Sequence, residues 1–407
     1  MPDPKSTKRF EDDVKMKNFF KGLKLKRKLI AILAEMHFFG NPSAKLKIVG
    51  VTGTNGKTTT ATLLYKITTA LGYKAGLIGT VENIIVDEKR PALITTPSPI
   101  NLNKLLKEMA NKGCEYVFME VSSHALDQNR VAGVTFVGGI FTNLTHDHLD
   151  YHKSIENYFL AKKKFFKMLS SDAFALSNID NEYGIKILEG VEAKRYTYGF
   201  KNKADFNEKL ETKLMGDFNM YNALAVYAAL MLLGMDKEKV KELMKNIEPP
   251  AGRFQYFNSL NGVLVIVDYA HTPDALENVL KTIQGIRKEG NKIISVFGCG
   301  GDRDPLKRKI MGKIGATNSD IAIFTSDNPR SEDPDKIINE MKVDLSQEDL
   351  KKVKTISNRH EAILEAVKLA QGGDIILCAG KGHENYQEIK GVKSHFDDME
   401  EFKKIIK

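Results

Sequence analysis

Short apolar runs alternate with amphipathic stretches along most of the chain. The apolar runs have the length of strands buried in a sheet. They are Leu46–Val51, Ala75–Thr80, Tyr116–Met119, Phe136–Thr142, Ala173–Ser177, Val263–Val267, Ile293–Phe297, Ile321–Thr325 and Ile375–Cys378. Between several of them, apolar residues recur with the helical period, over residues 58–71, 155–169, 219–233 and 237–246. This alternation predicts an α/β fold with mostly parallel sheets.

The segment Pro249–Arg253 interrupts this pattern with two prolines and a glycine. We interpret it as a linker between a central domain of residues 46–250 and a carboxy-terminal domain of residues 251–407. The second domain repeats strand and helix regularly, which predicts a Rossmann-like, doubly wound sheet. A chain of 407 residues can bury a sizeable core in each of the two domains.

The net charge of +9 is unevenly distributed. Residues 1–45 hold eleven Lys and Arg against five Asp and Glu, so +6 lies there and 9 − 6 = +3 lies in the rest of the chain. A body so nearly balanced in charge argues against nucleic-acid binding. Lysines and apolar residues are mixed between Val14 and Phe39. We therefore expect an amphipathic helix, lying on a membrane surface or packed on the next domain.

Cysteine usage and hydropathy bear on the compartment. The three cysteines, Cys114, Cys299 and Cys378, have no paired or metal-binding spacing, which is typical of reduced thiols. No apolar run approaches the length of a membrane span, and no signal peptide with a cleavage site is recognisable. We expect a cytoplasmic protein.

One stretch suggests a specific ligand. The predicted strand Leu46–Val51 leads into a loop of small and polar residues, and a helix follows: Gly53, Thr54, Asn55, Gly56, Lys57, Thr58 and Thr59. Backbone N–H groups of such a loop point at phosphates, the lysine carries charge to them, and the first hydroxyl can hold Mg²⁺. The motif departs from the strict pattern, because Val51 stands where a glycine is usual. The alternative is a turn that binds nothing. We predict ATP binding and a P-loop ATPase-type central domain.

Two polar positions near the predicted strand ends suit a metal. Glu120 comes at the carboxyl end of the strand that begins at Tyr116, so a parallel sheet would place it beside the phosphate loop. The segment Asn143–His152 holds three histidines and two aspartates. Zinc is an alternative there, but no cysteine supports it. Mg²⁺ bound with the nucleotide is the better interpretation.

The predicted helix 155–169 contains an unusual lysine. Its aromatic residues share one face, Lys162 falls at the centre of that face, and Lys163 and Lys164 point away as solvated charges. An ammonium directed into a core is costly unless it is paired or chemically altered. Lys162 either extends to solvent or belongs to a site. A neutral amine there can react with CO₂ to give a carbamate, an anion that binds Mg²⁺.

Four polar clusters follow the strand ends of the second domain, where ligands bind in such sheets. The clusters are Asp268–Pro273, Gly298–Asp304, Ser326–Arg330 and Gly380–Glu384. Their guanidinium, amide and carboxylate groups suit a small ligand with carboxylate and ammonium groups, such as an amino acid. Two asparagines, Asn219 and Asn222, share one face of a predicted helix and could cap it or bind a purine edge. Thr95 and Thr96 could be no more than a helix cap.

Together these residues resemble the Mur ligase family of ATP-dependent amino-acid ligases, from about Leu46 to near the carboxy terminus. The resemblance implies that Gly53–Thr58 is the ATP loop, that Glu120 and His148 are metal ligands, and that Lys162 carries a carbamate. It also implies three sets of contacts: Asn219, Asn222, Arg253 and Asp268 to the nucleotide; Thr95, Thr96, Ser122 and Arg130 to a muramyl peptide; and Arg303, Asp327, Asn328, Arg330, Gly380 and Glu384 to the incoming amino acid.

The sequence Asp327–Arg330 resembles members that use meso-diaminopimelate, because lysine-adding members usually differ at the arginine. The implied activity is an ADP-forming ligation of diaminopimelate to the D-Glu carboxylate of a UDP-N-acetylmuramyl dipeptide, through an acyl phosphate, in peptidoglycan synthesis. Two alternatives stay open. One is a related ligase acting on another carrier or substrate. The other is a nucleotide-binding subunit that needs a partner for the first domain.

The chain departs from the family at its beginning. Typical members carry a complete domain that grips the UDP end of the substrate, whereas the basic segment 1–45 stands in that place here. We therefore expect that residues 1–45 contact a membrane surface or a partner protein.

Overall fold

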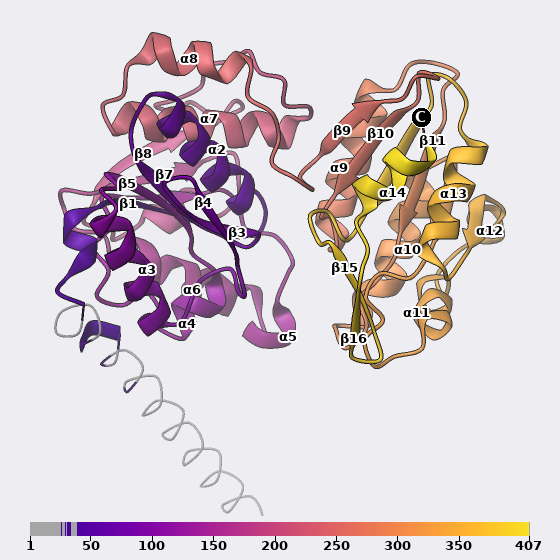
Figure 1. Cartoon of the computed structure of the whole chain (residues 1–407), viewed down its shortest axis with the longest axis horizontal. Helices are drawn as coiled ribbons and strands as arrows, with labels where there is room; N and C mark the ends of the chain where they lie inside the picture. Colours follow the sequence, from indigo (N-terminus) through magenta and orange to yellow (C-terminus); the bar gives the residue numbers. More distant parts are fainter. Residues whose placement is uncertain (1–25, 27–28, 30, 34–38, 407) are drawn as a thin grey trace, which may run out of the picture. The chain divides into compact units, whose positions relative to one another are not determined.

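The structure is a computed structural model that describes residues 26, 29, 31–33 and 39–406. These residues form two compact units (Figure 1). The first unit takes residues up to 144, 151–211 and 221–245, and the second takes 145–150, 212–220 and 246–407. Most of the predicted basic segment 1–45 lies outside the described residues. No helix among the described residues is long and apolar enough to cross a membrane.

The first unit is built on an eight-stranded sheet with the order β4-β3-β2-β5-β1-β6-β7-β8. Its strands are β1 (Lys47–Thr52), β2 (Ala75–Ile78), β3 (Glu82–Ile85), β4 (Glu88–Pro91), β5 (Tyr116–Glu120), β6 (Gly138–Phe141), β7 (Phe174–Asn178) and β8 (Lys194–Tyr198). The strands from β2 to β8 in this order are parallel, and β3 and β4 extend one edge with antiparallel pairs. Parallel strands bring their carboxyl ends to one edge, where the candidate site lies.

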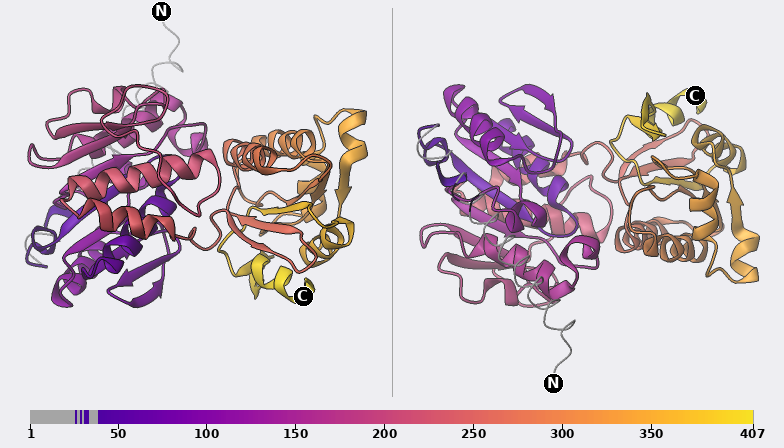
Figure 2. Two further views of the ribbon diagram at one scale, coloured as in Figure 1. Left: turned by 90° about the horizontal axis from the view of Figure 1, so that it is seen from above. Right: turned by 90° about the horizontal axis from the view of Figure 1, so that it is seen from below.

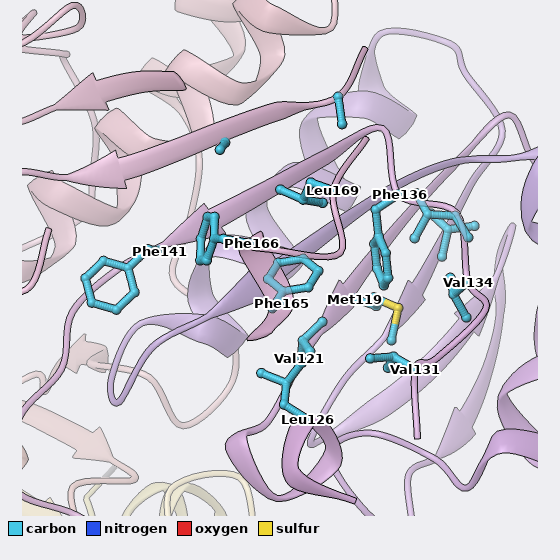
Figure 3. Packing of buried hydrophobic residues seen from close by; sticks show 14 of the residues in the cluster. Met119, Val121, Leu126, Val131, Val134, Phe136, Phe141, Phe165, Phe166 and Leu169 are labelled. Carbon is cyan, nitrogen blue, oxygen red and sulfur yellow. The ribbon is translucent and has the colours of Figure 1, made fainter. Parts of the chain in front are cut away.

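Helices and a large apolar cluster cover this sheet. The helical segments are η2 (Pro42–Lys45), α2 (Lys57–Ala70), α3 (Pro99–Asn111), α4 (Ser123–Asp127), α5 (Leu149–His152), α6 (Ile155–Phe166), η3 (Lys186–Leu188), α7 (Asp217–Leu232) and α8 (Lys237–Lys245). Phe165 and Phe166 of α6 pack with Met119, Phe136 and Phe141 of the sheet layer (Figure 3). Gly50 makes this close approach possible, because a Cβ there would lie 2.4 Å from the Phe165 ring.

The second unit contains a six-stranded sheet with the order β13-β12-β11-β14-β10-β9. Its strands are β9 (Gln255–Asn258), β10 (Leu264–Asp268), β11 (Ile293–Phe297), β12 (Ile321–Phe324), β13 (Val353–Thr355) and β14 (Ile375–Ala379). All neighbours are parallel except β9, which pairs antiparallel with β10. A separate hairpin is formed by β15 (Tyr386–Ile389) and β16 (Val392–His395).

Helices lie on both faces of this second sheet (Figure 2). They are α9 (Pro273–Ile286), α10 (Leu306–Asn318), α11 (Pro334–Met341), α12 (Gln347–Lys352), α13 (Arg359–Leu369) and α14 (Asp398–Ile405). Two apolar clusters fill the two interfaces, one including Leu276, Met311 and Ile337 and the other including Ile363 and Phe402. Helices on both faces of a parallel sheet are the doubly wound arrangement that the sequence predicted.

The strands and helices predicted from residue 46 onward are present, with bounds that differ by at most three residues. The sequence analysis did not identify β8, the antiparallel strands β3, β4 and β9, the short β13, or the hairpin β15–β16. Most of these strands are polar and partly exposed, and the buried β3 begins with Glu82 and Asn83, so none has the continuous apolar run by which the other buried strands are recognised.

Candidate active site

The loop 53–56, which has the sequence of a phosphate-binding loop, joins β1 to α2 as the motif predicts. Gly56 has φ 85°, which is the left-handed region that favours glycine, and it forms the N-cap of α2. Gly53 also requires a small residue, because a Cβ would lie 1.8 Å from Thr142 Oγ1. The chain therefore enters α2 with its first N–H groups at the carboxyl edge of the sheet, where they can face an anion.

Thr142 and Asn143, the two residues that follow β6, form hydrogen bonds with Asn55 of the loop. Thr142 Oγ1 donates to the carbonyl oxygen of Asn55 over 2.6 Å. Asn143 Oδ1 accepts from the Asn55 backbone N–H over 2.9 Å, and its Nδ2 donates to the Asn55 carbonyl oxygen over 3.2 Å. The loop is thus fixed in shape by the neighbouring strand as well as by its own sequence.

Two lysine ammonium groups converge on one carbonyl oxygen of the loop. Lys57 Nζ donates to the Gly53 oxygen over 2.9 Å and to the Thr54 oxygen over 2.7 Å. Lys162 Nζ donates to the same Gly53 oxygen over 2.7 Å. Lys162 therefore lies beside the loop, and both cations lie where polyphosphate charge would be bound.

Lys162 is inside the protein, with 1% of its surface exposed. Its ammonium lies over the Tyr158 ring, 4.3 Å from the ring centroid, and Tyr158 itself shares a hydrogen bond of 3.2 Å with Thr54. The sequence-based alternative that Lys162 extends to solvent is wrong. Lys164 is exposed as predicted, but Lys163 is only half-exposed, because its Nζ donates to the Lys186 oxygen over 2.6 Å.

Glu120 ends β5 beside β1, opposite Val51 in the parallel register. Its carboxylate accepts from Thr58 Oγ1 over 3.0 Å, and from the backbone and hydroxyl of Thr80 over 2.7 and 3.0 Å. Carboxylate and hydroxyl oxygens are ligands that Mg²⁺ prefers. The donors present therefore fit Mg²⁺. Among the described residues, no group of three or more His, Cys, Asp or Glu side chains could hold a metal ion.

The four predicted muramyl-peptide residues gather around the same strand end. Thr96 Oγ1 donates to the Glu120 carbonyl oxygen over 2.8 Å and accepts from the Ser122 backbone over 3.1 Å. Arg130 Nη1 donates to the Thr96 oxygen over 2.9 Å, and the Thr95 hydroxyl lies 3.1 Å from that of Thr80. Thr96 and Ser122 also meet directly over 3.3 Å. Neither threonine caps α3, whose N-cap is Ser98.

The two asparagines of α7 differ in position. Asn222 Oδ1 accepts from Thr60 Oγ1 over 3.5 Å, and a Cβ at Gly56 would lie 2.4 Å from that oxygen, so Asn222 packs against the phosphate-type loop. Asn219 belongs to the second unit and donates through Nδ2 to the Met215 carbonyl oxygen over 2.9 Å. Their contacts with a purine stay predictions.

His148 lies in the segment Thr145–Asp150, which groups with the second unit. Its φ is 54°, its backbone N–H donates to Asp147 Oδ1 over 2.8 Å, and its ring Nε2 lies 3.4 Å from Asp147 Oδ2. The role of His148 as a metal ligand with Glu120 stays a prediction.

Arg253 and Asp268 meet at the start of the second unit. Asp268 is buried and accepts backbone N–H groups of Phe254 and Ala270 over 2.6 and 2.7 Å. Burial raises the pKa of Asp268 to about 6, and the charge of Arg253 acts in the opposite direction. The Arg253 guanidinium lies over the Tyr269 ring, 4.5 Å from its centroid. This ring contact holds the guanidinium beside the carboxylate.

Two arginines of the predicted amino-acid pocket flank Gly300. A Cβ on Gly300 would lie 3.0 Å from Arg330 Nη1 and 3.6 Å from Arg303 Cγ. Arg330 adopts φ 51° and donates to the Gly301 oxygen over 2.7 Å, while its backbone N–H donates to the Glu388 oxygen over 3.0 Å. The hairpin β15–β16 thus fixes the backbone of Arg330. The Arg330 guanidinium, with the stem of Arg303 beside it, suits a carboxylate.

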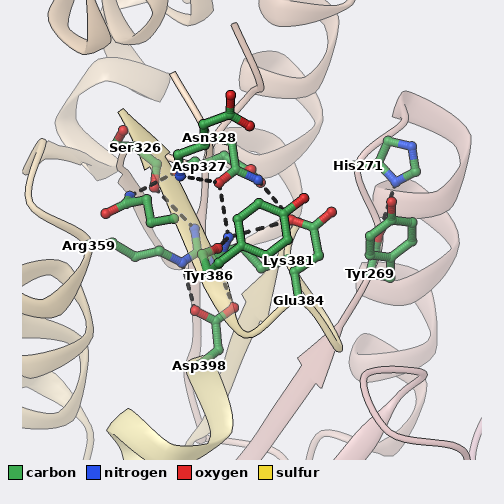
Figure 4. Close-up of polar contacts among 12 residues, drawn as sticks. Tyr269, His271, Ser326, Asp327, Asn328, Arg359, Lys381, Glu384, Tyr386 and Asp398 are labelled. Atoms are coloured by element: carbon green, nitrogen blue, oxygen red, sulfur yellow. Dashed lines mark hydrogen bonds and ion pairs between the residues drawn. The ribbon is translucent and has the colours of Figure 1, made fainter. Parts of the chain in front are cut away.

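The remaining pocket residues meet at the carboxyl ends of β12 and β14 (Figure 4). Asn328 Nδ2 donates to Glu384 Oε2 over 2.8 Å. Gly380 has φ 112°, and a Cβ there would lie 2.5 Å from Asp327 Oδ2, so the position requires glycine. Burial, and then the charge of Asp327, raise the pKa of Glu384, whereas Lys381 lowers it. All six predicted amino-acid contacts lie in this unit.

Sequence reasoning missed Thr80, Asn143 and Tyr158. Thr80 ends a predicted strand and Asn143 follows another, so the rule that ligands bind at the carboxyl edge of a parallel sheet could have identified both. Tyr158 lies one helical turn before Lys162 on the same face, which the helical period reveals. The sequence analysis had used that face only to place Lys162.

The first unit combines a glycine loop of the phosphate-binding kind, two lysines and a glutamate at a strand end. The second unit is doubly wound and carries two arginines near Gly300. Together these features define a nucleotide-dependent enzyme that acts on a small charged substrate. Residues 51–230 match the Mur ligase middle domain, and residues 252–382 match the glutamate ligase domain of Mur ligases. The chain belongs to the Mur ligase family, whose members are ATP-dependent amide ligases, and the predicted family is confirmed.

Named relatives agree with this assignment. The chain is 52% identical over 385 residues to the UDP-N-acetylmuramoyl-L-alanyl-D-glutamate--2,6-diaminopimelate ligase of Bacteroides thetaiotaomicron, covering 90% of this chain and 80% of the relative. A solved structure of a ligase with the same name is 34% identical, with a TM-score of 0.61, and the match covers 89% of this chain and 78% of that one. The Escherichia coli FolC structure with ADP matches with a TM-score of 0.67 at 19% identity, over 90% and 95% of the two chains, which shows a common fold.

Proposed function

We propose that this chain ligates meso-diaminopimelate to the D-Glu carboxylate of a UDP-N-acetylmuramyl dipeptide, with hydrolysis of ATP to ADP. The observation that carries the proposal is the pocket of the second unit, where Arg303 and Arg330 flank Gly300 and Asn328 contacts Glu384. Diaminopimelate has a second carboxylate and a second ammonium group, which suit the arginine and the glutamate side chains of this unit. The names of the relatives at 52% and 34% identity support the same substrate.

The first unit would bind ATP and the acceptor carboxylate. Backbone N–H groups of the loop 53–56 and the Lys57 ammonium bind the polyphosphate. Thr58 and Glu120 would hold Mg²⁺, which supplies charge neutralisation between the phosphate and the carboxylate. Thr95, Thr96, Ser122 and Arg130 would position the muramyl peptide beside them. Thr96 and Arg130 already share a hydrogen bond of 2.9 Å through the Thr96 carbonyl oxygen.

The reaction then proceeds in two steps. The acceptor carboxylate oxygen attacks the γ-phosphorus of ATP, ADP leaves, and an acyl phosphate forms. The free amine of diaminopimelate attacks the acyl carbon, the amide forms, and phosphate leaves as the amine loses a proton. Lys57, which contacts the Gly53 oxygen, stabilises the negative charge that develops in the first step.

We further propose a carbamate on Lys162. The side chain is almost fully buried, and its Nζ lies beside the loop that would bind the polyphosphate. The neutral form of the amine can attack CO₂: an N–C bond forms, the nitrogen gives up one proton to solvent, and the product is a carbamate anion. It would join Thr58, Glu120 and His148 as a metal ligand.

The basic segment 1–45 supports a separate proposal. Its eleven cationic residues against five anionic ones favour contact with an anionic membrane surface or an acidic partner protein. Sedimentation of the protein with anionic vesicles, before and after removal of residues 1–38, would measure the membrane contact. A cytoplasmic location stays a prediction.

ADP release is the test of the main proposal. Purified protein is given ATP, Mg²⁺ and UDP-N-acetylmuramyl dipeptide, with diaminopimelate or lysine in turn. We expect release with diaminopimelate and little with lysine, which lacks the second carboxylate. Release with lysine alone would contradict the assigned specificity. Release with neither amino acid would favour a chain that acts on another carrier or only with a partner.

A further inference from the structure

A second buried lysine lies beneath the amino-acid pocket. Lys381 follows β14 in the cluster Gly380–Glu384, and its side chain is 0% exposed. A buried ammonium is unfavourable unless acceptors surround it. No step of the proposed reaction uses it, so its position requires another explanation.

Three acceptors surround the Lys381 ammonium (Figure 4). Its Nζ donates to Asn328 Oδ1 over 3.3 Å, to Glu384 Oε2 over 3.5 Å, and to the Tyr386 carbonyl oxygen. It also lies 5.4 Å from the centroid of the Tyr386 ring. Lys381 therefore joins the two predicted ligand contacts Asn328 and Glu384 to the hairpin β15–β16.

These contacts fix which way the Asn328 amide points. Its oxygen accepts from Lys381 Nζ and from the Glu388 backbone N–H, the latter over 2.9 Å. Its Nδ2 can then donate only in the other direction, to Glu384 Oε2 over 2.8 Å. With the amide reversed, its nitrogen would face two donors. Lys381 thus fixes the orientation of the Asn328 amide. The amide and Lys381 together orient the Glu384 carboxylate.

The charges in this part of the unit favour a cationic ligand. Arg359 and Asp398 form a fully buried pair, with Nη2 and Oδ2 2.7 Å apart. With Lys381, Asp327 and Glu384 they make two positive and three negative groups, so the ionised cluster carries a net charge of −1. An ammonium group on a ligand would neutralise it.

The ionised form of Glu384 depends on its neighbours. Burial and the Asp327 charge raise the pKa of Glu384, whereas Lys381 and the Asn328 hydrogen bond lower it. Tyr269 and Tyr386 also face this carboxylate, and both hydroxyls have raised pKa values, mainly because of burial, so they are neutral near neutral pH. Lys381 is therefore the cation in direct contact that keeps Glu384 able to accept hydrogen bonds from an ammonium.

We propose that Lys381 is a positioning residue for the amino-acid substrate: its buried ammonium orients Asn328 and keeps Glu384 as the carboxylate that receives the ammonium group of the substrate. The proposal rests on the proposed ligase function, because it takes the pocket of Glu384 to bind the incoming amino acid. It predicts that Lys381 acts on amino-acid binding through Glu384, and that it has no direct part in ATP binding.

The test uses the full chain and four variants: Lys381→Met, Glu384→Gln, the double variant, and Lys393→Met. Lys393 is an exposed lysine 4.3 Å from the same Tyr386 ring, so it is a matched control for loss of a cation at that ring. We expect Lys381→Met to raise the KM for diaminopimelate roughly 10–100-fold, the effect of losing hydrogen bonds to a charged group. The KM for ATP and the parameters of Lys393→Met should not change.

Two further readouts separate positioning from a purely structural role. In Lys381→Met, the rise in the KM for diaminopimelate with falling pH should begin at a higher pH than in the wild type, because Glu384 then protonates at a higher pH. In the Glu384→Gln background, adding Lys381→Met should change the KM no further, because its target is gone. If Lys381→Met does not fold, Lys381→Gln, which keeps a neutral donor near Asn328, is compared in the same cycle.

Additive effects of the two substitutions, or a Lys381→Met protein with the wild-type KM and pH profile, would overturn the proposal. Calorimetric titration of diaminopimelate into the wild-type protein distinguishes the two proposals. Binding without turnover refutes the ligase function alone. The effects of the single and double substitutions are then compared through the dissociation constants for diaminopimelate. No binding to the wild-type protein refutes both.

Discussion

Two buried lysines, Lys162 and Lys381, stand out among the side chains of the protein. One lies in each unit, at 1% and 0% exposure, and each donates to backbone and polar atoms of a candidate site. Desolvating an ammonium costs several kcal/mol in each case, so a lysine that served only packing would be less stable there than a methionine. We infer that both are retained for chemistry, one at the phosphate end and one at the amino-acid end of the reaction.

Replacing Lys162 by alanine tests the first of them. We expect Lys162→Ala to lower the rate of ADP release roughly 100–1000-fold, the usual effect of removing one charge-stabilising group. The rate is measured with saturating ATP and diaminopimelate. Lys164→Ala, on the exposed side of the same helix, is the control and should keep the wild-type rate. A Lys162→Ala enzyme at full rate would remove the carbamate from the mechanism.

Gly380 gives a prediction about backbone conformation. Gly380→Ala must place a Cβ 2.5 Å from Asp327 Oδ2 at φ 112°, so we expect a loss of about 1–3 kcal/mol in the free energy of unfolding and weaker amino-acid binding. Gly285→Ala is the control, because Gly285 lies in α9 with nothing within 4 Å of its Cβ position. That substitution should stabilise the protein by roughly 0.5–1 kcal/mol. Urea unfolding of both variants measures the difference.

His383 gives a prediction about pH. Burial, and then the charge of Arg253, lower the pKa of His383 to about 3, and its Nδ1 is buried without a hydrogen bond. The unfolded chain therefore takes up this proton below about pH 6.5 while the folded chain does not, so stability falls as the pH falls. Between about pH 7.5 and pH 5, we expect the free energy of unfolding to fall by about 2 kcal/mol less in His383→Gln than in the wild type. Equal losses in urea unfolding would assign the acid sensitivity to other groups.

At the scale of elements, α6 shows how one helix serves both core and site. Its aromatic face packs on the sheet, and Lys162 leaves from the middle of that face toward the loop. The helix begins at an N-cap, Ser154, whose Oγ accepts from the Asn157 backbone N–H over 3.2 Å. The start of the helix, and with it the position of Lys162 along the helix, depends on this cap.

The cap can be tested by two substitutions. We expect Ser154→Ala to lower the free energy of unfolding by about 1 kcal/mol, because it leaves helix N–H groups without an acceptor. Ser154→Gly should cost only a few tenths of a kcal/mol, since glycine lets water reach those groups. Equilibrium unfolding in urea measures both. Equal stability of the alanine variant and the wild type would contradict the role of the cap.

The edge elements carry more of the site than their sequence suggests. The hairpin β15–β16 is polar, yet its Glu388 contacts both Asn328 and Arg330 through backbone groups. Backbone contacts of this kind do not depend on which side chains the hairpin carries, so they cannot be predicted from a residue pattern. This is why the sequence analysis found the pocket residues but not the element that holds them.

At the scale of the whole molecule, most residues proposed for the two halves of the reaction lie in different units, although His148, Asn219, Arg253 and Asp268 of the proposed metal and nucleotide sites belong to the second unit. The six predicted amino-acid contacts all belong to the second unit, whereas the loop 53–58, Glu120 and Lys162 belong to the first. Each unit has its own core and could bind its own ligand.

Hydrogen exchange can test this division. We expect diaminopimelate alone to slow amide exchange in peptides that cover Gly298–Arg330 and Gly380–Glu388, because bound ligand stabilises the local closed state. Peptides from residues 46–144 should be unaffected. ADP with Mg²⁺ should protect the loop 53–58. Protection of the first unit by diaminopimelate alone would contradict the assignment of the pocket.

The sequence by itself determined the features that depend on neighbours along the chain. The order of strands and helices, the glycine loop before α2 and the position of Lys162 on the apolar face of its helix all follow from patterns of a few residues, because burial of one face sets the local conformation. The same rules placed the polar clusters at strand ends, and hence most of the candidate site.

Tertiary structure alone decided the contacts between residues far apart in sequence. Thr80 meets Glu120 across 40 positions, Asn143 meets Asn55 across 88, and Lys381 meets Asn328 across 53. Such pairs depend on strand order and register, which hydrophobic periodicity does not specify, since any parallel order buries the same faces. Outside a helix, the sequence pattern therefore does not show whether a lysine is buried or exposed. Lys381 is such a case, and only the folded structure shows that it is buried.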